Sequence, residues 1–193
     1  TPLVDADSLF AQAQTASQAQ DWRTAINLLD ALTGAAPDYR PDEVKGMLFE
    51  ALVALGMQRL NEDRLEEGIS LIDRAAIYGA LPPLAYSGRN LAADYIRAIG
   101  FWGADWEAAI EALRALYIAV PEYRDVQHRL QQAYVEYADS YVERGEFCPA
   151  VPLYQSALGV IYDGEVEGKR ASAASGCASA TPTPTPTVEP TVI

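Results

Sequence analysis

The sequence has few of the residues on which catalytic and metal sites depend. Its 193 residues include a single histidine, His128, and two cysteines. A zinc site needs several His or Cys ligands at close spacing, which this set does not supply. A Gly-x-Ser-x-Gly turn and a glycine-rich phosphate loop are also missing. We therefore predict a non-enzymatic protein without cofactor or metal, in which His128 lies on a helix surface.

Basic charge and long apolar runs are scarce as well. Fourteen basic residues stand against 27 acidic ones, which gives a net charge of −13. Nucleic acids and anionic membranes both attract a basic surface, and this composition provides none. No long apolar run occurs that could span a bilayer, so no transmembrane helix is predicted in this segment. The expected partners are therefore proteins, including other copies of this chain, and not nucleic acid or membrane.

What the chain does contain is repetition. Trp22 and Trp106 open two similar segments, and the turns Pro37–Arg40 and Pro121–Arg124 follow these tryptophans at the same offset. Half of all residues are hydrophobic, which is typical of a globular protein. Self-similarity at a fixed spacing indicates a solenoid, in which stacked units bury a continuous core.

Each unit has the pattern of paired helices. Apolar and small residues recur at helical spacing between short turns, beginning with an alanine-rich stretch before Asp21. Pro41 with Asp42 and Glu43 is a typical helix start. The pattern predicts helices over residues 22–35, 41–60, 65–78, 84–99, 105–120, 125–144, 147–161 and, as a cap, 166–174.

The last of these pairs resembles the tetratricopeptide repeat. The matching residues are Tyr134-x2-Tyr137-Ala138-x2-Tyr141-x3-Gly145-x-Phe147-x2-Ala150-x3-Tyr154-x2-Ala157. Aligning Ala25, Gly68, Ala109 and Ala150 gives steps of 43, 41 and 41 residues, longer than the usual repeat of about 34. The resemblance implies an all-α, right-handed α-solenoid of about four such helix pairs with a C-terminal capping helix. We expect this domain over residues 1–175 and an extended tail over 176–193.

The resemblance also implies a partner-binding groove. In that family the first helix of each pair lines a concave surface that binds other proteins. A clamp for a peptide carboxylate uses Lys, Arg and Asn there, whereas this chain offers apolar and acidic residues, so such a clamp is not expected. The groove positions in this chain are Phe10, Val53, Met57, Leu60, Leu91, Phe101, Trp102, Val135 and Val142.

The Phe101-Trp102-Gly103 turn has two interpretations. Exposed aromatic side chains contribute strongly to protein binding, so the turn is a candidate hot spot. Alternatively, Trp102 folds back and caps the repeat core, since tryptophan is usually largely buried. The sequence leaves both open.

The two cysteines are predicted to meet. Cys148 begins the last core helix, and the chain then turns near Gly164 and returns through the cap toward Cys177. At about 1.5 Å per helical residue the two arms differ by only about 3 Å, so an antiparallel hairpin brings both sulfurs to one end. We expect a disulfide, with two free thiols as the alternative. A disulfide would favour an extracytoplasmic location.

The tail points to the same location. Thr181, Thr183, Thr185 and Thr187 alternate with prolines, which favour an extended, polyproline-like segment. Such segments resemble the linkers of bacterial secreted and surface proteins, and their hydroxyls are candidate O-glycan acceptors. The apolar residues Val188, Val192 and Ile193 would suit docking into a neighbouring copy.

Three functions are compatible with these features. The first is a protein-interaction scaffold of the bacterial cell surface or extracytoplasmic space. The second is a self-assembling subunit of a filament or surface layer, joined through its Thr-Pro tail. The third is a helical cell-wall enzyme or carbohydrate-binding domain, for which acid pairs such as Glu66 and Glu67 offer little support because acids are common on every helix face.

Overall fold

The computed structural model describes residues 5–180, which form α-helices joined by turns, with no strand among them. The expected all-α class is therefore confirmed. The tail and its candidate glycan sites Thr181, Thr183, Thr185 and Thr187 lie outside the described residues. The helices are α1 (Ala6–Gln18), α2 (Trp22–Ala35), α3 (Pro41–Asn61), α4 (Leu65–Ala75), α5 (Pro83–Gly100), α6 (Trp106–Ala119), α7 (Val126–Glu143), α8 (Phe147–Val160) and α9 (Gly164–Ala180).

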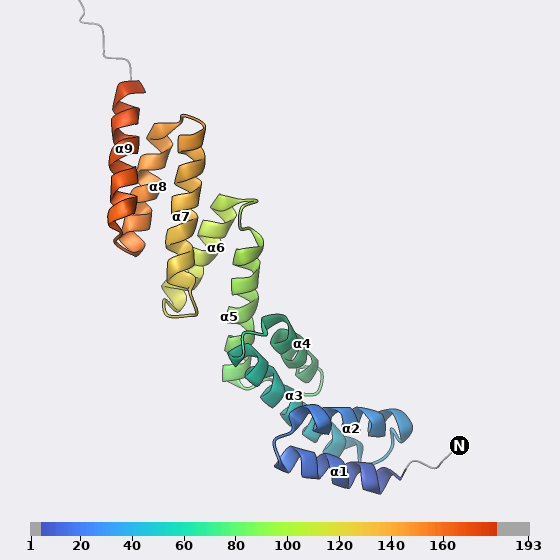
Figure 1. Ribbon diagram of the computed structural model, residues 1–193. Helices are drawn as coiled ribbons and strands as arrows, with labels where there is room; N and C mark the ends of the chain where they lie inside the picture. Colours follow the sequence, from blue (N-terminus) through green and yellow to red (C-terminus); the bar gives the residue numbers. More distant parts are fainter. Residues whose placement is uncertain (1–4, 181–193) are drawn as a thin grey trace, which may run out of the picture. The chain divides into compact units, whose positions relative to one another are not determined.

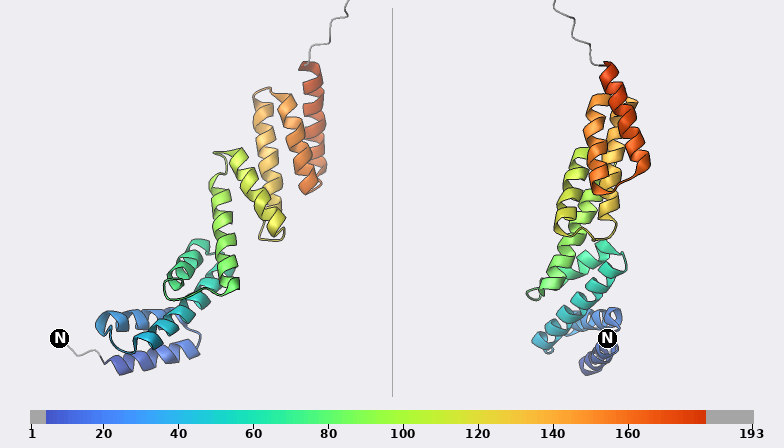
Figure 2. Two further views of the ribbon diagram at one scale, coloured as in Figure 1. Left: turned by 180° about the vertical axis from the view of Figure 1, so that it is seen from behind. Right: turned by 90° about the vertical axis from the view of Figure 1, so that its left-hand side faces the viewer.

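Contacts divide the chain into two compact units, residues 1–96 and 97–193, with the boundary inside α5. In the first unit, α1 packs on α2 and α3 on α4, and α2 also contacts α3 (Figure 1). In the second unit, α7 packs on α8 and α6 on α7. There α9 lies beside α8, as both views of Figure 2 show. Each unit is thus built from consecutive helices that pack as neighbours, the arrangement expected of a helical repeat.

Small residues allow the paired helices to approach closely. Ala13 faces this contact from α1, and Ala138 and Ala150 occupy the matching positions of α7 and α8; all three are fully buried. In the second pair the positions are glycines. A Cβ on Gly56 would lie 2.6 Å from Ile72 Cγ1, and one on Gly68 would lie 2.9 Å from the Gly56 carbonyl oxygen. The α3–α4 crossing therefore has no room for a methyl group.

The turn inside each pair repeats the same backbone conformation. In every pair a residue two or three positions beyond the end of the first helix has a positive φ: 58° at Gln20, 62° at Asp63 and 75° at both Gly103 and Gly145. A residue in the left-handed backbone conformation ends a helix by turning the chain sharply, and glycine adopts this conformation without steric cost. The repeat is therefore visible in backbone angles even where the residue type differs.

The long-range repeat that relates Trp22 to Trp106 also appears in the backbone. Arg40 and Arg124 close the two Pro-x-Tyr-Arg turns with φ of 40° and 51°, an unusual conformation for arginine. The Arg40 guanidinium carbon lies 5.2 Å from the ring centre of Phe10 and 5.4 Å from that of Tyr39. Arg124 lies 5.4 Å from the Tyr123 ring. Stacking on aromatic rings thus offsets part of the backbone strain in both turns.

Two helices, α4 and α9, differ from the sequence prediction by more than one residue at an end. Helix α4 ends at Ala75 and not at Tyr78, because the Tyr78 N–H donates to the Ala75 carbonyl at 2.9 Å in a tighter turn. Helix α9 runs from Gly164 to Ala180, so the domain boundary expected at 175 falls inside it. The end of α9 is rich in alanine and serine, which give no apolar periodicity, although alanine is the strongest helix former.

Candidate partner-binding surfaces

The expected groove positions contribute mostly to packing. In the first unit, Val53 and Met57 are partly buried against the cores, and Leu91 is partly buried as well. In the second unit, Val135 and Val142 are partly buried against the core of α7, α8 and α9. None of these five side chains is fully exposed. The interior of the helix stack therefore receives much of the face that was expected to form an open groove.

Two of the groove positions are corrected outright. Phe10 is only 4% exposed, because the Tyr39 ring packs 5.8 Å from it and Arg40 stacks above it. Leu60 is 6% exposed and fills the space that a side chain at Gly68 would need. Both residues are core residues and are unavailable to a partner.

Trp102 combines features of the two interpretations made from the sequence. Phe101 and Trp102 are both partly buried. The Trp102 ring packs edge-on against Trp106 at 5.3 Å, and the Arg129 guanidinium carbon lies 5.4 Å from its centre. Trp102 therefore covers the start of α6, as the capping interpretation expects, while part of its ring stays accessible.

A pocket of about 330 Å³ lies among α7, α8 and α9. Val142 and Phe147 form apolar walls, and Asp139 accepts a hydrogen bond from the buried Tyr154 hydroxyl. Lys169 of α9 donates to the other Asp139 oxygen at 2.7 Å. Burial and the bond to Asp139 raise the pKa of Tyr154. The polar groups are mutually satisfied, so they hold α9 in place.

Three exposed apolar side chains lie close together in the sequence where α4 leads into α5. Ile77 is 79% exposed, Leu84 77% and Tyr86 60%. We call these three residues the α4–α5 edge. Each of them offers apolar surface that a partner could remove from water. The edge is part of the first unit and belongs to no expected groove.

The second unit has a similar feature. Ile118, near the end of α6, is 75% exposed and lies at the repeat position of Ile77, and Tyr162 after α8 is 76% exposed. The sequence prediction places Ile77 and Ile118 inside the helices 65–78 and 105–120 and assigns no exposed surface to either. A signal is available: Ile77 falls off the inward stripe of Ile69, Ile72 and Ala75.

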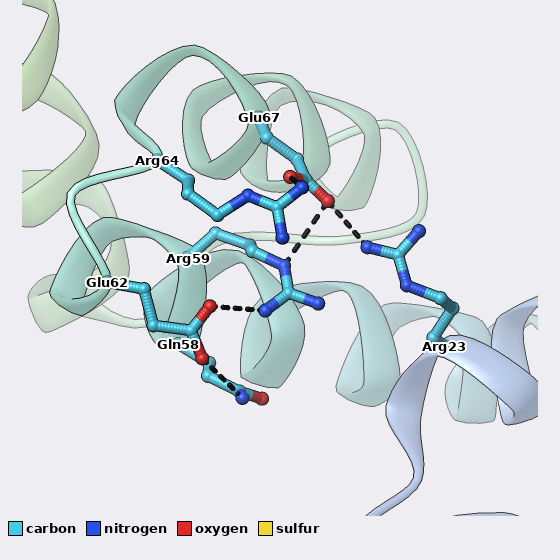
Figure 3. A network of polar contacts seen from close by, with 6 residues as sticks. All are labelled: Arg23, Gln58, Arg59, Glu62, Arg64 and Glu67. Carbon is cyan, nitrogen blue, oxygen red and sulfur yellow. Dashed lines mark hydrogen bonds and ion pairs between the residues drawn. The ribbon is translucent and has the colours of Figure 1, made fainter.

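The acidic residues of the first unit are engaged by arginines (Figure 3). Glu67 of α4 accepts bonds from Arg23 of α2 at 2.7 Å and from Arg59 of α3 at 3.2 Å, and it also pairs with Arg64. Arg59, with a side chain only 12% exposed, pairs in addition with Glu62. The network ties the first helix pair to the second and leaves little free charge at this position.

This network predicts a pH dependence. Burial alone would raise the pKa of Glu67, but the Arg23 hydrogen bond and the charges of Arg64 and Arg59 lower it overall. A lowered folded-state pKa stabilises the fold above the ordinary glutamate value of about 4.3, and this stability is lost as pH falls below that value. Glu67→Gln is therefore expected to flatten the decline in Tm below about pH 4.3, as measured by thermal unfolding against pH.

Glu66→Gln is the matched control. Glu66 is the neighbouring residue and is exposed, with no ion pair shown by the structure. It should keep the wild-type pH dependence. Equal curves for Glu67→Gln and the wild type would contradict the assigned role of the network.

Cys148 and Cys177 lie together at the open end of the α8–α9 hairpin. Their Cα atoms are 4.7 Å apart, within the range that a disulfide spans. The juxtaposition agrees with the length argument made from the sequence. We therefore expect the protein to carry the Cys148–Cys177 disulfide in solution.

The remaining candidate groups show no convergence. His128 is exposed on α7. Within residues 5–180, no three His, Cys, Asp or Glu side chains are grouped to hold a metal ion. The pKa shifts of Asp21, Asp73 and Glu167 are all downward, caused first by bonds to Thr24, Arg89 and Arg170 respectively. None of the helices described is both long and apolar enough to cross a membrane.

The described residues therefore belong to an all-α helical-repeat protein with apolar side chains exposed at its repeat ends. No protein-family model and no curated protein matches the sequence. A solved structure of MamA from AMB-1 shares 17% identity over 91% of this chain and 84% of that chain, with a TM-score of 0.31. A further MamA crystal structure shares 17% identity over 90% of this chain and 88% of that chain, with a TM-score of 0.29. At these TM-scores the similarity carries no argument about function.

Proposed function

We propose that this chain is a non-enzymatic protein-interaction scaffold that works outside the cytoplasm. The observation that carries the proposal is the α4–α5 edge. Ile77, Leu84 and Tyr86 are each at least 60% exposed, although the adjoining cores are filled by buried aliphatic residues. Binding would remove this apolar area from water, which is the main favourable term in protein association.

The location rests on a separate observation. Disulfides persist in oxidising compartments and are rare in the cytoplasm. The positions of Cys148 and Cys177 support such a bond, and the Thr-Pro sequence after residue 180 resembles the linkers of bacterial surface proteins. Both features favour a cell-surface or secreted protein, and the resemblance to the tetratricopeptide repeat supports protein binding.

The edge should be required for binding. Ile77→Asp combined with Leu84→Asp is expected to abolish recovery of a specific partner from the native source, because it places two charges in the apolar contact. Both side chains are largely exposed, so far-UV circular dichroism and Tm should stay at the wild-type values. The measurement is quantitative mass spectrometry of proteins recovered with each variant.

Glu50→Ala is the control, because Glu50 is exposed on α3 within the same unit. It should recover the partner as the wild type does. Recovery of the same proteins by the double variant would contradict binding at the α4–α5 edge.

A further inference from the structure

A second candidate site lies in the first unit, separate from the α4–α5 edge residues. The end of α2, the start of α3 and the turn after α4 enclose an apolar pocket of about 70 Å³. Pro37 and Pro41 contribute to its walls together with the rings of Tyr39 and Tyr78, and Lys45 lies among the lining residues. Sites for cofactors are typically about 300–1,000 Å³. This pocket has the size for one aliphatic side chain of a peptide.

The chemistry of the walls favours an extended, proline-containing peptide. Proline-rich segments dock on surfaces lined by aromatic rings, because their preformed backbone loses little entropy on binding. Tyr39 and Tyr78 supply such rings from two different turns. The walls therefore suit a peptide with an aliphatic residue near a proline.

Lys45 adds a charge requirement. Among residues 5–180, Lys45 and Arg114 are the two basic side chains for which the structure shows no ion pair, hydrogen bond or aromatic partner. The protein as a whole carries a net charge of −13. The unpaired ammonium group beside the apolar pocket therefore contrasts with the acidic character of the whole protein. It favours a peptide that also carries a carboxylate.

The second unit contains the equivalent turn, but the basic residue there is paired, so an unpaired cation at this turn is not a general property of the repeat. Arg129 stands at the repeat position of Lys45, and Tyr162 stands at that of Tyr78. Arg129 donates to Asp125 at 3.0 Å and stacks on Trp102, so its charge is used within the fold. Tyr162 is largely exposed. The first unit alone combines this turn with an unpaired cation.

We propose that the pocket binds residues 188–190 from the tail of a second copy of this chain. This stretch reads Val188-Glu189-Pro190, and Glu189 is the sole charged side chain in residues 181–193. Val188 enters the apolar pocket, Glu189 pairs with Lys45, and Pro190 packs on the tyrosine rings. The contact is head-to-tail, so it links copies into open or closed chains. This self-association goes beyond the proposed binding of a partner at the α4–α5 edge.

A charge-exchange experiment tests the pairing. A fluorescent synthetic peptide of residues 181–193 is titrated into the full chain and followed by anisotropy. Lys45→Glu in the protein, or Glu189→Lys in the peptide, should each weaken binding at least about tenfold, which corresponds to about 1.4 kcal/mol. The two changes together should restore most of the affinity. Arg114→Glu, which alters the other unpaired cation, should bind the wild-type peptide normally.

The proposal would be overturned by equal binding of the peptide to the wild type and to Lys45→Glu, or by a charge exchange that restores no affinity. Val188→Asp in the peptide needs no change to the protein, and it should also weaken binding, because it places a charge in the apolar pocket. A full chain that sediments as a monomer at every concentration would also overturn the proposal. Self-association requires the apparent molecular mass to rise with protein concentration, and Val188→Asp should prevent that rise. Either failure leaves the α4–α5 edge untouched, because none of these variants alters Ile77, Leu84 or Tyr86.

Discussion

Reduction of the protein is expected to loosen the second half of α9 and to lower the stability of the α8–α9 hairpin by about 3–4 kcal/mol. The bond between Cys148 and Cys177 would close a loop with a sequence separation of 29 residues. Such a crosslink stabilises mainly by limiting the unfolded chain. The buried residues of α9, Val166 and Ala173, lie within its first ten residues. Beyond them, Gly176 sits close against the Phe147 ring. The end of the helix thus depends most on the bond.

Hydrogen exchange of α9 peptides with and without reductant measures this effect. Exchange should rise most over residues 174–180 and little in α6 and α7. The double variant Cys148→Ser, Cys177→Ser should behave like reduced protein and should not respond to reductant. Intact mass after alkylation of unreduced protein gives the decisive control: two labelled thiols would show that no disulfide is present.

Gly56→Ala is expected to destabilise the first unit by about 1–3 kcal/mol, the usual range for overpacking a core. Its added Cβ would meet Ile72 Cγ1 at 2.6 Å and the Gly68 carbonyl oxygen at 3.2 Å. Ile72 is fully buried and β-branched, so its rotamer is strongly restricted within a helix. The two helices must therefore separate, and the urea midpoint followed by circular dichroism should fall.

Gly46→Ala is the matched control in the same helix. Nothing lies within 4 Å of a Cβ placed there. Alanine is the better helix former, so this variant should gain roughly 0.5–1 kcal/mol. Equal shifts in the two variants would contradict the close crossing of α3 and α4.

Much of the fold could be predicted because it depends on local signals. Aspartates before helices mark their starts: Asp21 and Asp105 accept bonds from the Thr24 and Ala108 amides at 3.2 and 3.0 Å. The repeat steps locate the buried small residues of each second helix. The end of α9 could not be predicted in the same way, since its alanines and serines carry no apolar stripe and its position depends on a contact with Phe147.

The candidate site was harder to predict than the fold. Assigning Phe10 and Leu60 correctly requires knowing which side of a helix a distant turn covers, and Phe10 of α1 is covered by Arg40, which lies beyond α2 in the chain. The α4–α5 edge is missed because exposure of Ile77 depends on where α4 ends, and helix ends are less regular than helix interiors. The Lys45 pocket combines three segments that no sequence window contains together.

Site-specific photo-crosslinking in the native source tests the scaffold proposal most directly. A photoreactive amino acid placed at Ile77 or at Leu84 should crosslink to the same discrete protein, while one placed at the exposed Glu50 of α3 should not. That result would assign partner binding to the α4–α5 edge. Crosslinks of equal yield and identity from all three positions, or none from Ile77 and Leu84, would contradict it.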